Sequence, residues 1–353
     1  MMISIVHGYI FFIGLVYSHP YYHDLVKLNK GKEVYLFETE YDNNPEFNGD
    51  FESNDTTGWL FPELDSPTHT FSETYERWES FDFTPPAFHN WGITKERYGH
   101  QNIVIISDPT DSNTTVLKVI YPKGSRNPSH SPLGGAGYES TPISILDGIR
   151  QTARLSYQVY FPEEFNFTQG NGIVVGGKLP GLYGASAECS GGNSAQNCFS
   201  ARFMWREEGL GEIYLYVPKM AHHLPSLCQV PPVSVCDPKY GFSLGRGSFR
   251  FKRGAWNKLS VAVRVNQVPD EPTGQLRVWY DDEVVIDYNQ LIWRVNDTVG
   301  YTGIDFETFF GGSSDRFNTP IDTYTLYKDF RLVVGQNVEQ IESTSGEVAS
   351  TSE

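Results

Sequence analysis

The side chains best suited to chemistry in this sequence lie between Phe199 and Pro218, in the stretch FSARFMWREEGLGEIYLYVP. Apolar and polar residues alternate on both sides of a glycine-containing break, and this pattern indicates two β-strands joined in a hairpin. Side chains two positions apart share one face of a sheet, so one face of the hairpin is apolar. The other face carries a hydroxyl, a guanidinium and two phenols. They belong to Ser200, Arg202, Tyr214 and Tyr216.

The length of the turn predicts how the two strands of this hairpin pair. With the turn centred near Glu208, Arg202 lies opposite Tyr214. In the same register Ser200 lies opposite Tyr216. We therefore expect these four polar side chains to line one concave sheet face, with the apolar face directed into a core.

A lysine stands just before the hairpin, in the stretch GNGIVVGGKLPGLYG of residues 170–184. A short apolar strand there runs into Lys178, which follows two glycines and precedes a proline turn. A lysine in such a place is usually a solvated turn residue. Because the hairpin follows so closely, we expect Lys178 to enter the same sheet face from a neighbouring strand end.

Together these residue types suit β-elimination from a uronic acid polymer. The C5 proton of a uronate is barely acidic while the adjacent carboxylate is charged, so cations and hydrogen-bond donors must neutralise that carboxylate. A guanidinium such as Arg202 can fork onto both oxygens, and an ammonium such as Lys178 can stabilise the enolate-like charge. A tyrosine can take the C5 proton or protonate the departing O4, provided that cations lower its pKa from about 10.

Three motifs carry a resemblance to a known family: GGKLPGLYG, FSARFMWR and GEIYLYVP, in this order. They resemble the alginate and polyuronate lyases of polysaccharide lyase family 14. The likeness covers roughly residues 59–335 and is strongest from Gly172 to Pro218. It implies a β-jelly roll that cleaves alginate, polymannuronate or glucuronan by β-elimination, with an acidic polysaccharide as partner and with no cofactor and no metal.

The resemblance implies roles at matching positions only. Lys178 matches the essential lysine of the family. Ser200 and Arg202 match its site serine and arginine. Tyr214 and Tyr216 match its paired tyrosines. Lys178, Tyr214 and Tyr216 are therefore predicted to be catalytic, and the sequence leaves open which of the three is the base.

The net charge of the chain, −16 at pH 7, should repel a polyanion. Screening limits that repulsion to about 10 Å at moderate salt, so the local field decides whether a polyuronate can bind. The cations that could form a positive groove with Lys178 are Arg202, Arg206, Lys219, Lys123 and Arg126. Taken singly, the last four are explained more simply as solvated surface residues, but Arg206, Lys123 and Arg126 are kept as predicted substrate-binding residues beside Ser200 and Arg202.

The four cysteines form two close pairs, Cys189 with Cys198 and Cys228 with Cys236. An even number, close spacing and a secretory leader favour two small-loop disulfides in these pairings, although four cysteines allow three. A zinc site is the alternative. It would need all four thiols in one place or His222 and His223 as partners, and no Cys-x₂-Cys knuckle is present, so no metal is predicted.

The N-terminus, residues 1–18, has the shape of a secretory signal peptide. Its apolar run from Ile10 to Val16 is too short to span a bilayer and is followed by small Ser18. A short membrane anchor is the alternative. Four Asn-x-Ser/Thr sequons are compatible with secretion and with glycosylation, at Asn54, Asn113, Asn166 and Asn296. We expect a secreted monomer that binds neither membrane nor nucleic acid.

The body of the chain, residues 59–336, consists of many short segments with strand character. NIVIISD, TVLKVIYP and WNKLSVAVRVN alternate or are rich in β-branched and aromatic residues, and stretches with a helical period are almost absent. With 33 Gly and 21 Pro between the segments, the pattern predicts an all-β fold, a jelly-roll sandwich of two antiparallel sheets.

Two further segments flank the predicted jelly roll. The N-terminal extension, residues 19–58, is acidic: from Glu33 to Asp82 there are fourteen acids and one base, Arg77. The tail, residues 337–353, is rich in Ser, Thr and Glu and is predicted to be disordered.

Two other classes of function fit parts of the sequence. A jelly-roll glycoside hydrolase needs paired carboxylates, and the stretch GIDFET offers Asp305 and Glu307 on one strand face. A non-catalytic lectin is the second alternative, since aromatic-rich sandwiches commonly bind sugars. The presence of Lys178 together with both tyrosines speaks against a lectin.

Overall fold

The protein was analysed as a computed structural model, which describes residues 75–335 except 82, 144–149, 168–175, 220 and 238, and also four short strands nearer the N-terminus. The chain divides into two units, Met1–His69 and Thr70–Glu353. In the first unit, β1 (Ile3–Val6) pairs with β2 (Tyr9–Phe12), and β3 (Leu25–Asn29) pairs with β4 (Lys32–Leu36). Most of the predicted signal peptide and acidic extension, and the whole predicted tail, lie outside the described residues, so the predicted boundaries remain predictions.

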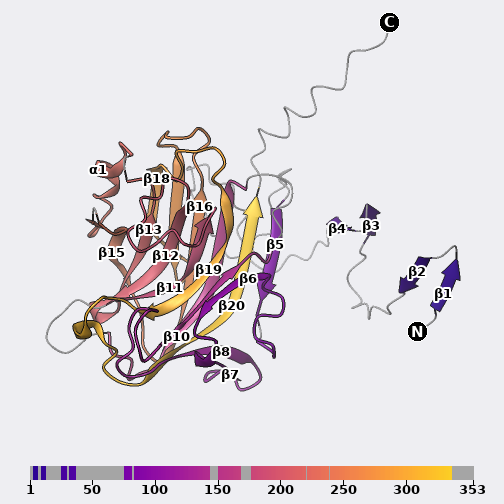
Figure 1. Ribbon diagram of the computed structural model, residues 1–353, viewed down its shortest axis with the longest axis horizontal. Coiled ribbons are helices and arrows are strands. Elements are labelled where there is room, and N and C mark those ends of the chain that lie inside the picture. The colour runs from indigo at the N-terminus through magenta and orange to yellow at the C-terminus, as the bar shows by residue number, and fades with distance from the viewer. Residues whose placement is uncertain are drawn as a thin grey trace, which may run out of the picture. The chain divides into compact units, whose positions relative to one another are not determined.

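The second unit contains two eight-stranded antiparallel sheets (Figure 1). We call the first the site sheet; its strand order is β14-β15-β13-β12-β11-β19-β9-β6. Its strands are β6 (Ile93–Tyr98), β9 (Ala136–Ser140), β11 (Gly176–Gly184), β12 (Phe199–Arg206), β13 (Leu210–Tyr216), β14 (Val235–Cys236), β15 (Phe242–Arg250) and β19 (Tyr301–Phe310).

We call the second the back sheet; its order is β18-β17-β16-β10-β20-β8-β7, and β5 also pairs with β20 (Figure 1). Its strands are β5 (Tyr75–Ser80), β7 (Ile103–Ser107), β8 (Thr115–Tyr121), β10 (Thr152–Phe161), β16 (Ala255–Arg264), β17 (Gly274–Tyr280), β18 (Glu283–Leu291) and β20 (Thr323–Gly335). Two antiparallel sheets packed face to face confirm the predicted all-β jelly roll.

Helical structure in the described residues is confined to a single α-helical turn, α1 (Leu224–Leu227), and three 3₁₀ turns. The 3₁₀ turns are η1 (His100–Asn102), η2 (Glu207–Gly209) and η3 (Asp315–Phe317). No helix in that part of the chain is long and apolar enough to cross a membrane.

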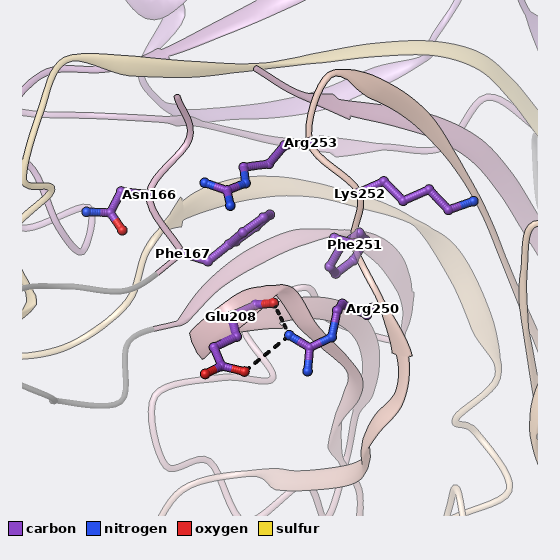
Figure 2. A pocket seen from close by; sticks show the side chains of 7 residues that line it. All are labelled: Asn166, Phe167, Glu208, Arg250, Phe251, Lys252 and Arg253. Carbon is purple, nitrogen blue, oxygen red and sulfur yellow. Dashed lines mark hydrogen bonds and ion pairs between the residues drawn. The ribbon is translucent and has the colours of Figure 1, made fainter. Parts of the chain in front are cut away.

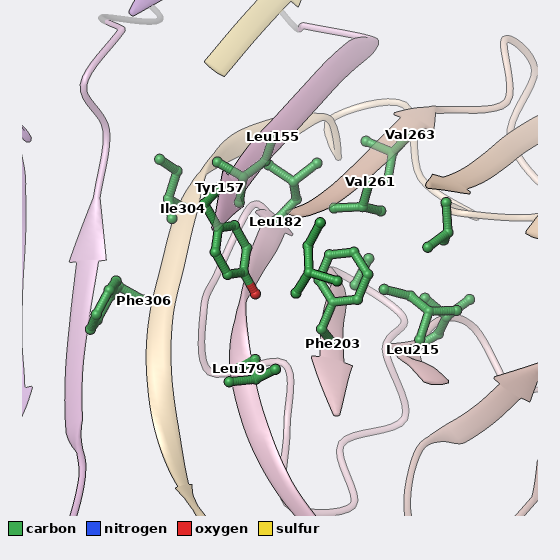
Figure 3. Packing of buried hydrophobic residues seen from close by; sticks show 14 of the residues in the cluster. Leu155, Tyr157, Leu179, Leu182, Phe203, Leu215, Val261, Val263, Ile304 and Phe306 are labelled. Atoms are coloured by element: carbon green, nitrogen blue, oxygen red, sulfur yellow. The ribbon is translucent and has the colours of Figure 1, made fainter. Parts of the chain in front are cut away.

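The hydrophobic core lies between the two sheets and is formed by the alternate side chains of their strands. Figure 3 shows Leu155 and Tyr157 of β10 with Val261 of β16, all from the back sheet, beside Phe203 and Leu215 of the site sheet. All five are fully buried. Full burial of one such side chain stabilises the fold by about 1.5–3 kcal/mol, so the inner faces hold the two sheets together.

Candidate active site

The hairpin predicted from the sequence is formed by β12 and β13, joined by η2 at Glu207–Gly209. Arg202 pairs with Tyr214. Ser200 pairs with Tyr216. Side chains of directly paired residues lie on the same side of a sheet, so the predicted register and shared face are confirmed. The alternate residues of β12 point into the core, which leaves the polar set on the outer face of the site sheet.

Strand β11 carries Lys178 next to this hairpin, and an irregularity in the strand decides its direction. The pairing of β11 with both neighbours shifts between Lys178 and Gly181. Between these positions β11 has one residue more than β12 and one residue fewer than β19. Pro180 lies in this irregular stretch, a place where a central strand tolerates a residue without an N–H. Its carbonyl oxygen accepts a hydrogen bond of 2.9 Å from the Tyr157 hydroxyl. Because of this shift, positions 178 and 181 both lie on the outer face although they are three residues apart. Leu179 is buried in the core.

Lys178 and the two tyrosines come together as predicted. The Lys178 ammonium lies 5.3 Å from the ring centre of Tyr214 and 5.6 Å from that of Tyr216. The two rings are 5.8 Å apart and meet edge to face. Lys178 is half-buried, and burial together with the nearby Arg202 guanidinium lowers the pKa of Lys178 to about 7. Burial raises the pKa of the Tyr214 phenol, and Tyr216 adds to this rise.

Arg202 belongs to a buried cluster of charges. It is 0% exposed and forms ion pairs with Glu307 and, at 3.0 Å, with Asp305. Gly181 lies between Arg202 and Asp305 in the strand register, and a Cβ there would come within 2.7 Å of the Arg202 Cα. Since Gly181 has no side chain, the guanidinium can cross β11 to the carboxylates of β19. The predicted fork of Arg202 onto a substrate carboxylate does not fit, because the guanidinium has no exposed surface.

The same carboxylates face a second arginine, which the sequence did not single out. Arg97 of β6 lies 3.6 Å from Asp305 and 3.7 Å from Glu307, and it also approaches Glu139 of β9 at 3.7 Å. Burial raises the pKa of Asp305 to about 6. Burial acts in the same direction on Glu307, but Arg202, Lys178 and Arg97 outweigh it and lower the pKa. The two carboxylates that a hydrolase would need, Asp305 and Glu307, are therefore both paired with arginines.

A second charge cluster lies on the other side of the tyrosines. Glu212 is 0% exposed and accepts hydrogen bonds from Arg206, from Arg246 at 2.7 Å and from Ser243. Burial alone would raise the pKa of Glu212, but the two arginines lower it. The Arg206 guanidinium carbon lies 5.8 Å from the Tyr214 ring, and its side chain keeps 16% of its surface exposed. Of the two predicted substrate-binding arginines beside the tyrosines, Arg202 and Arg206, Arg206 is the one that keeps exposed surface.

The remaining predicted substrate-binding residues lie in other surroundings. Ser200 is 0% exposed and donates a hydrogen bond of 2.9 Å to the carbonyl oxygen of Cys189, so its hydroxyl is already engaged within the protein. Lys123 and Arg126 belong to the loop after β8. The Arg126 guanidinium is held there by an ion pair of 2.6 Å with Asp315. Contact with substrate fits Ser200 poorly and stays a prediction for Lys123 and Arg126.

Both predicted disulfides are present. Cys189 is bonded to Cys198 and Cys228 to Cys236, and no free cysteine occurs in the described residues. These pairings overturn the zinc alternative, because all four sulfurs are committed to disulfides. Within the part of the chain that the structure describes, no group of three or more His, Cys, Asp or Glu residues is arranged to hold a metal ion.

A separate cavity of 510 Å³ lies beside the tip of the β12–β13 hairpin (Figure 2). It is lined by Asn166, Phe167, Glu208, Arg250, Phe251, Lys252 and Arg253. Arg250 forms an ion pair with Glu208 at 3.3 Å. Lys252 forms an ion pair with Asp281 at 2.6 Å. None of the predicted catalytic residues lines this cavity, so it is separate from the candidate active site on the outer face of the site sheet.

The protein is thus a jelly roll whose outer sheet face carries an amine and two phenols between clusters of paired charges. The sequence matches the profile of "Polysaccharide lyase 14" over residues 109–330. The marine PL-14 alginate lyase from Aplysia kurodai is similar in structure, with 30% identity and a TM-score of 0.61; the match covers 72% of this chain and 97% of that one. The chain belongs to polysaccharide lyase family 14, and it is a polysaccharide lyase.

A second solved structure shares the fold. The alginate lyase vAL-1 from a Chlorella virus is 20% identical with a TM-score of 0.56, and the match covers 69% of this chain and 92% of that one. No curated protein matched the sequence. The family profile and the match to the Aplysia kurodai enzyme confirm the predicted family and reaction class, and neither the hydrolase nor the lectin alternative is favoured.

Proposed function

We propose that this lyase cleaves alginate, polymannuronate or glucuronan by β-elimination, with Lys178 as the base and Tyr214 as the acid. The observation that supports this assignment is that Lys178 and Tyr214 lie next to each other and have pKa values shifted in opposite directions. The pKa of Lys178 is lowered to about 7, so near neutral pH much of its amine is free to accept a proton. The pKa of Tyr214 is raised, so its phenol keeps a proton to donate. Opposed shifts of adjacent groups mark an acid and a base.

In the proposed reaction the Lys178 amine takes the C5 proton, and the electron pair left on C5 forms the C4=C5 double bond. The C4–O4 bond breaks, and Tyr214 protonates the departing O4. Lys178 becomes an ammonium as negative charge builds up on the substrate carboxylate, so the new positive charge appears where it stabilises the transition state. Arg206, which keeps exposed surface beside Tyr214, meets the same carboxylate.

Arg202 has a different role in this proposal from the one predicted from sequence. Its guanidinium faces Asp305 and Glu307 rather than the outside, so it acts on the reaction through its charge. A buried cation next to an amine favours the neutral form of that amine. We therefore assign Arg202 to lowering the pKa of Lys178.

The test is incubation of the purified protein with alginate, polymannuronate and glucuronan in separate assays. Elimination leaves a conjugated C4=C5 double bond that absorbs in the ultraviolet, hydrolysis leaves only new reducing ends, and a lectin leaves neither. We expect ultraviolet-absorbing product from at least one polymer and almost none from folded Lys178→Ala. New reducing ends without absorbance, or a Lys178→Ala variant as fast as the parent, would refute the proposal.

We also propose that the protein is secreted. Two disulfides favour an oxidising compartment, and residues 1–18 fit a signal peptide. Of the sequons, Asn113 is exposed. Mass spectrometry of protein recovered from culture medium should find a chain that starts after Ser18 and carries glycan on Asn113. Retention of residues 1–18 on the recovered protein would contradict the signal peptide.

A further inference from the structure

Each site tyrosine accepts a hydrogen bond from the backbone of a different loop. The Gly241 N–H donates to the Tyr214 hydroxyl oxygen at 3.0 Å. The Gly192 N–H donates to the Tyr216 hydroxyl oxygen at 3.3 Å. A phenol oxygen that accepts an N–H keeps its own hydrogen available as a donor. The same N–H stabilises the phenolate once that hydrogen has left.

The close approach at both positions requires glycine. A Cβ on Gly241 would lie 2.7 Å from the Tyr214 ring, 2.8 Å from the Tyr216 ring and 2.6 Å from the Leu215 carbonyl oxygen. Gly192 has a φ of +94°, and a Cβ there would lie 2.8 Å from the Lys239 carbonyl oxygen. Side chains at these positions would push the loops away from the phenols.

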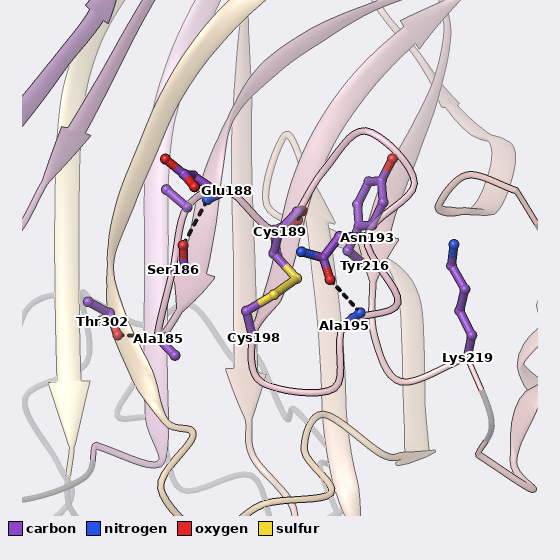
Figure 4. The surroundings of a disulfide bond; sticks show 12 residues. Ala185, Ser186, Glu188, Cys189, Asn193, Ala195, Cys198, Tyr216, Lys219 and Thr302 are labelled. Carbon is purple, nitrogen blue, oxygen red and sulfur yellow. Dashed lines mark hydrogen bonds between the residues drawn. A yellow bond between two sulfur atoms is a disulfide. The ribbon is translucent and has the colours of Figure 1, made fainter.

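The Cys189–Cys198 disulfide closes the loop that carries Gly192, and this loop lies against Tyr216 (Figure 4). Cys189, Ala195, Cys198 and Tyr216 form a small buried cluster apart from the main core. The loop is further joined to β12 by the hydrogen bond from Ser200 to Cys189. Both the disulfide and Ser200 thus hold the Gly192 N–H in place.

Lys219 joins the two loops to each other. Its ammonium donates to the Gly192 carbonyl oxygen at 3.2 Å and to the Lys239 carbonyl oxygen at 3.4 Å. Lys239 lies two residues before Gly241, so one charged side chain holds both donor loops. Hydrogen bonds from an ammonium are stronger than those between neutral groups, which suits Lys219 to this task.

We propose that the loop closed by Cys189–Cys198 and the segment Lys239–Gly241, joined by Lys219, form a frame that supplies one backbone N–H to each tyrosine and stabilises the phenolate formed when Tyr214 gives up its proton. Lys219 is then a positioning residue and not the substrate cation considered from the sequence. The inference rests on the proposed function, because it assigns the frame a role in that proton transfer.

Lys219→Met tests the frame, with Lys239→Met as a matched control. Lys239 carries the same charge on the same surface, but its ammonium lies over the Tyr240 ring at 5.2 Å and does not join the loops. We expect Lys219→Met to lower kcat about tenfold with KM unchanged, Lys219→Arg to recover much of the loss, and Lys239→Met to match the parent. A rise in KM without a change in kcat would make Lys219 a substrate contact and overturn the inference.

A second pair of variants addresses the N–H donor itself. Gly241→Ala should lower kcat more than Lys219→Met does, because a Tyr214 phenolate without its donor is less stable. Gly191→Ala is the control. Gly191 lies beside Gly192 in the Cys189–Cys198 loop with a φ of +60°, but a Cβ there meets nothing within 4 Å, so the activity of this variant should stay near that of the parent. Equal losses of kcat in Gly241→Ala and Gly191→Ala would mean that backbone strain alone causes the effect, and this result would overturn the inference.

Amide hydrogen exchange tests the frame independently of the proposed reaction. Lys219→Met should speed exchange at Gly192 and Gly241, and Lys239→Met should not. Faster exchange without ultraviolet-absorbing product from the parent would support the frame while refuting the proposed function. Unchanged exchange and unchanged kcat in Lys219→Met, with an active parent, would overturn the frame alone.

Discussion

Removing the charge of Arg202 should destabilise the protein as strongly as a large cavity in the core would. Arg202→Met keeps much of the volume and, among the described residues, leaves Arg97 as the remaining ion-pair partner of Asp305 and Glu307, at 3.6 and 3.7 Å. The side chains of Arg202 and Asp305 are 0% exposed and that of Glu307 is 7% exposed, so water cannot replace the lost partner. Breaking a buried pair costs about 3–5 kcal/mol, which lowers Tm by roughly 10 °C in a domain of this size.

Urea unfolding at low and high salt measures this cost, with Lys252→Met as the control. The Lys252–Asp281 pair is as short as 2.6 Å but more than half of the Lys252 side chain is exposed, so its loss should cost less than about 1 kcal/mol. The Arg202 effect should persist at high salt, because a buried pair is poorly screened. Adding Asp305→Asn to Arg202→Met should restore part of the stability. An Arg202→Met protein as stable as Lys252→Met, or no restoration, would refute the buried-cluster argument.

Three further predictions concern the reaction. Elimination should accelerate as pH rises through about 7, because Lys178 must lose its proton before it can accept one; a kcat/KM that falls through this range would contradict Lys178 as the base. Arg202→Met should move this rise in activity to higher pH, because Arg202 lowers the pKa of Lys178, and Glu307→Gln should move it to lower pH, because Glu307 raises that pKa. Shifts in the same direction in both variants would contradict this electrostatic control of Lys178. Tyr214→Phe should lower kcat by about 10²–10⁴-fold with little change in KM, and an effect on KM alone would reassign Tyr214 to binding.

The hairpin could be predicted from the sequence because its information is local. Alternation fixes which side chains share a face, and the length of the turn at Glu208 fixes the pairing of Arg202 with Tyr214. The two disulfides were predictable for a related reason, since each joins cysteines within one short loop. Lys178 was predicted correctly as a neighbour of the hairpin, but the Pro180 bulge that turns it onto the outer face gave no signal beyond a proline in an apolar strand.

The surroundings of Arg202 could not be predicted, because they depend on the order of strands in the sheet. Arg97, Glu139 and Asp305 come from β6, β9 and β19, which are far apart in the sequence and adjacent only in the fold. Alternation shows that a residue faces outward from a sheet but not whether its neighbours cover it. A guanidinium on the outer face was therefore expected to be available to substrate, whereas the structure engages it with Asp305 and Glu307.

The arrangement of charges shows how an acidic protein could present the proposed base, Lys178, to an acidic polymer. On the outer face of the site sheet Arg202 is balanced by carboxylates of β19 and Arg206 by Glu212. No ion pair involves Lys178 among the described residues, so burial and the nearby Arg202 can lower its pKa to about 7. A lysine paired with a carboxylate would stay protonated and could not act as a base. In the proposed mechanism the paired arginines thus leave Lys178 able to exchange a proton near neutral pH.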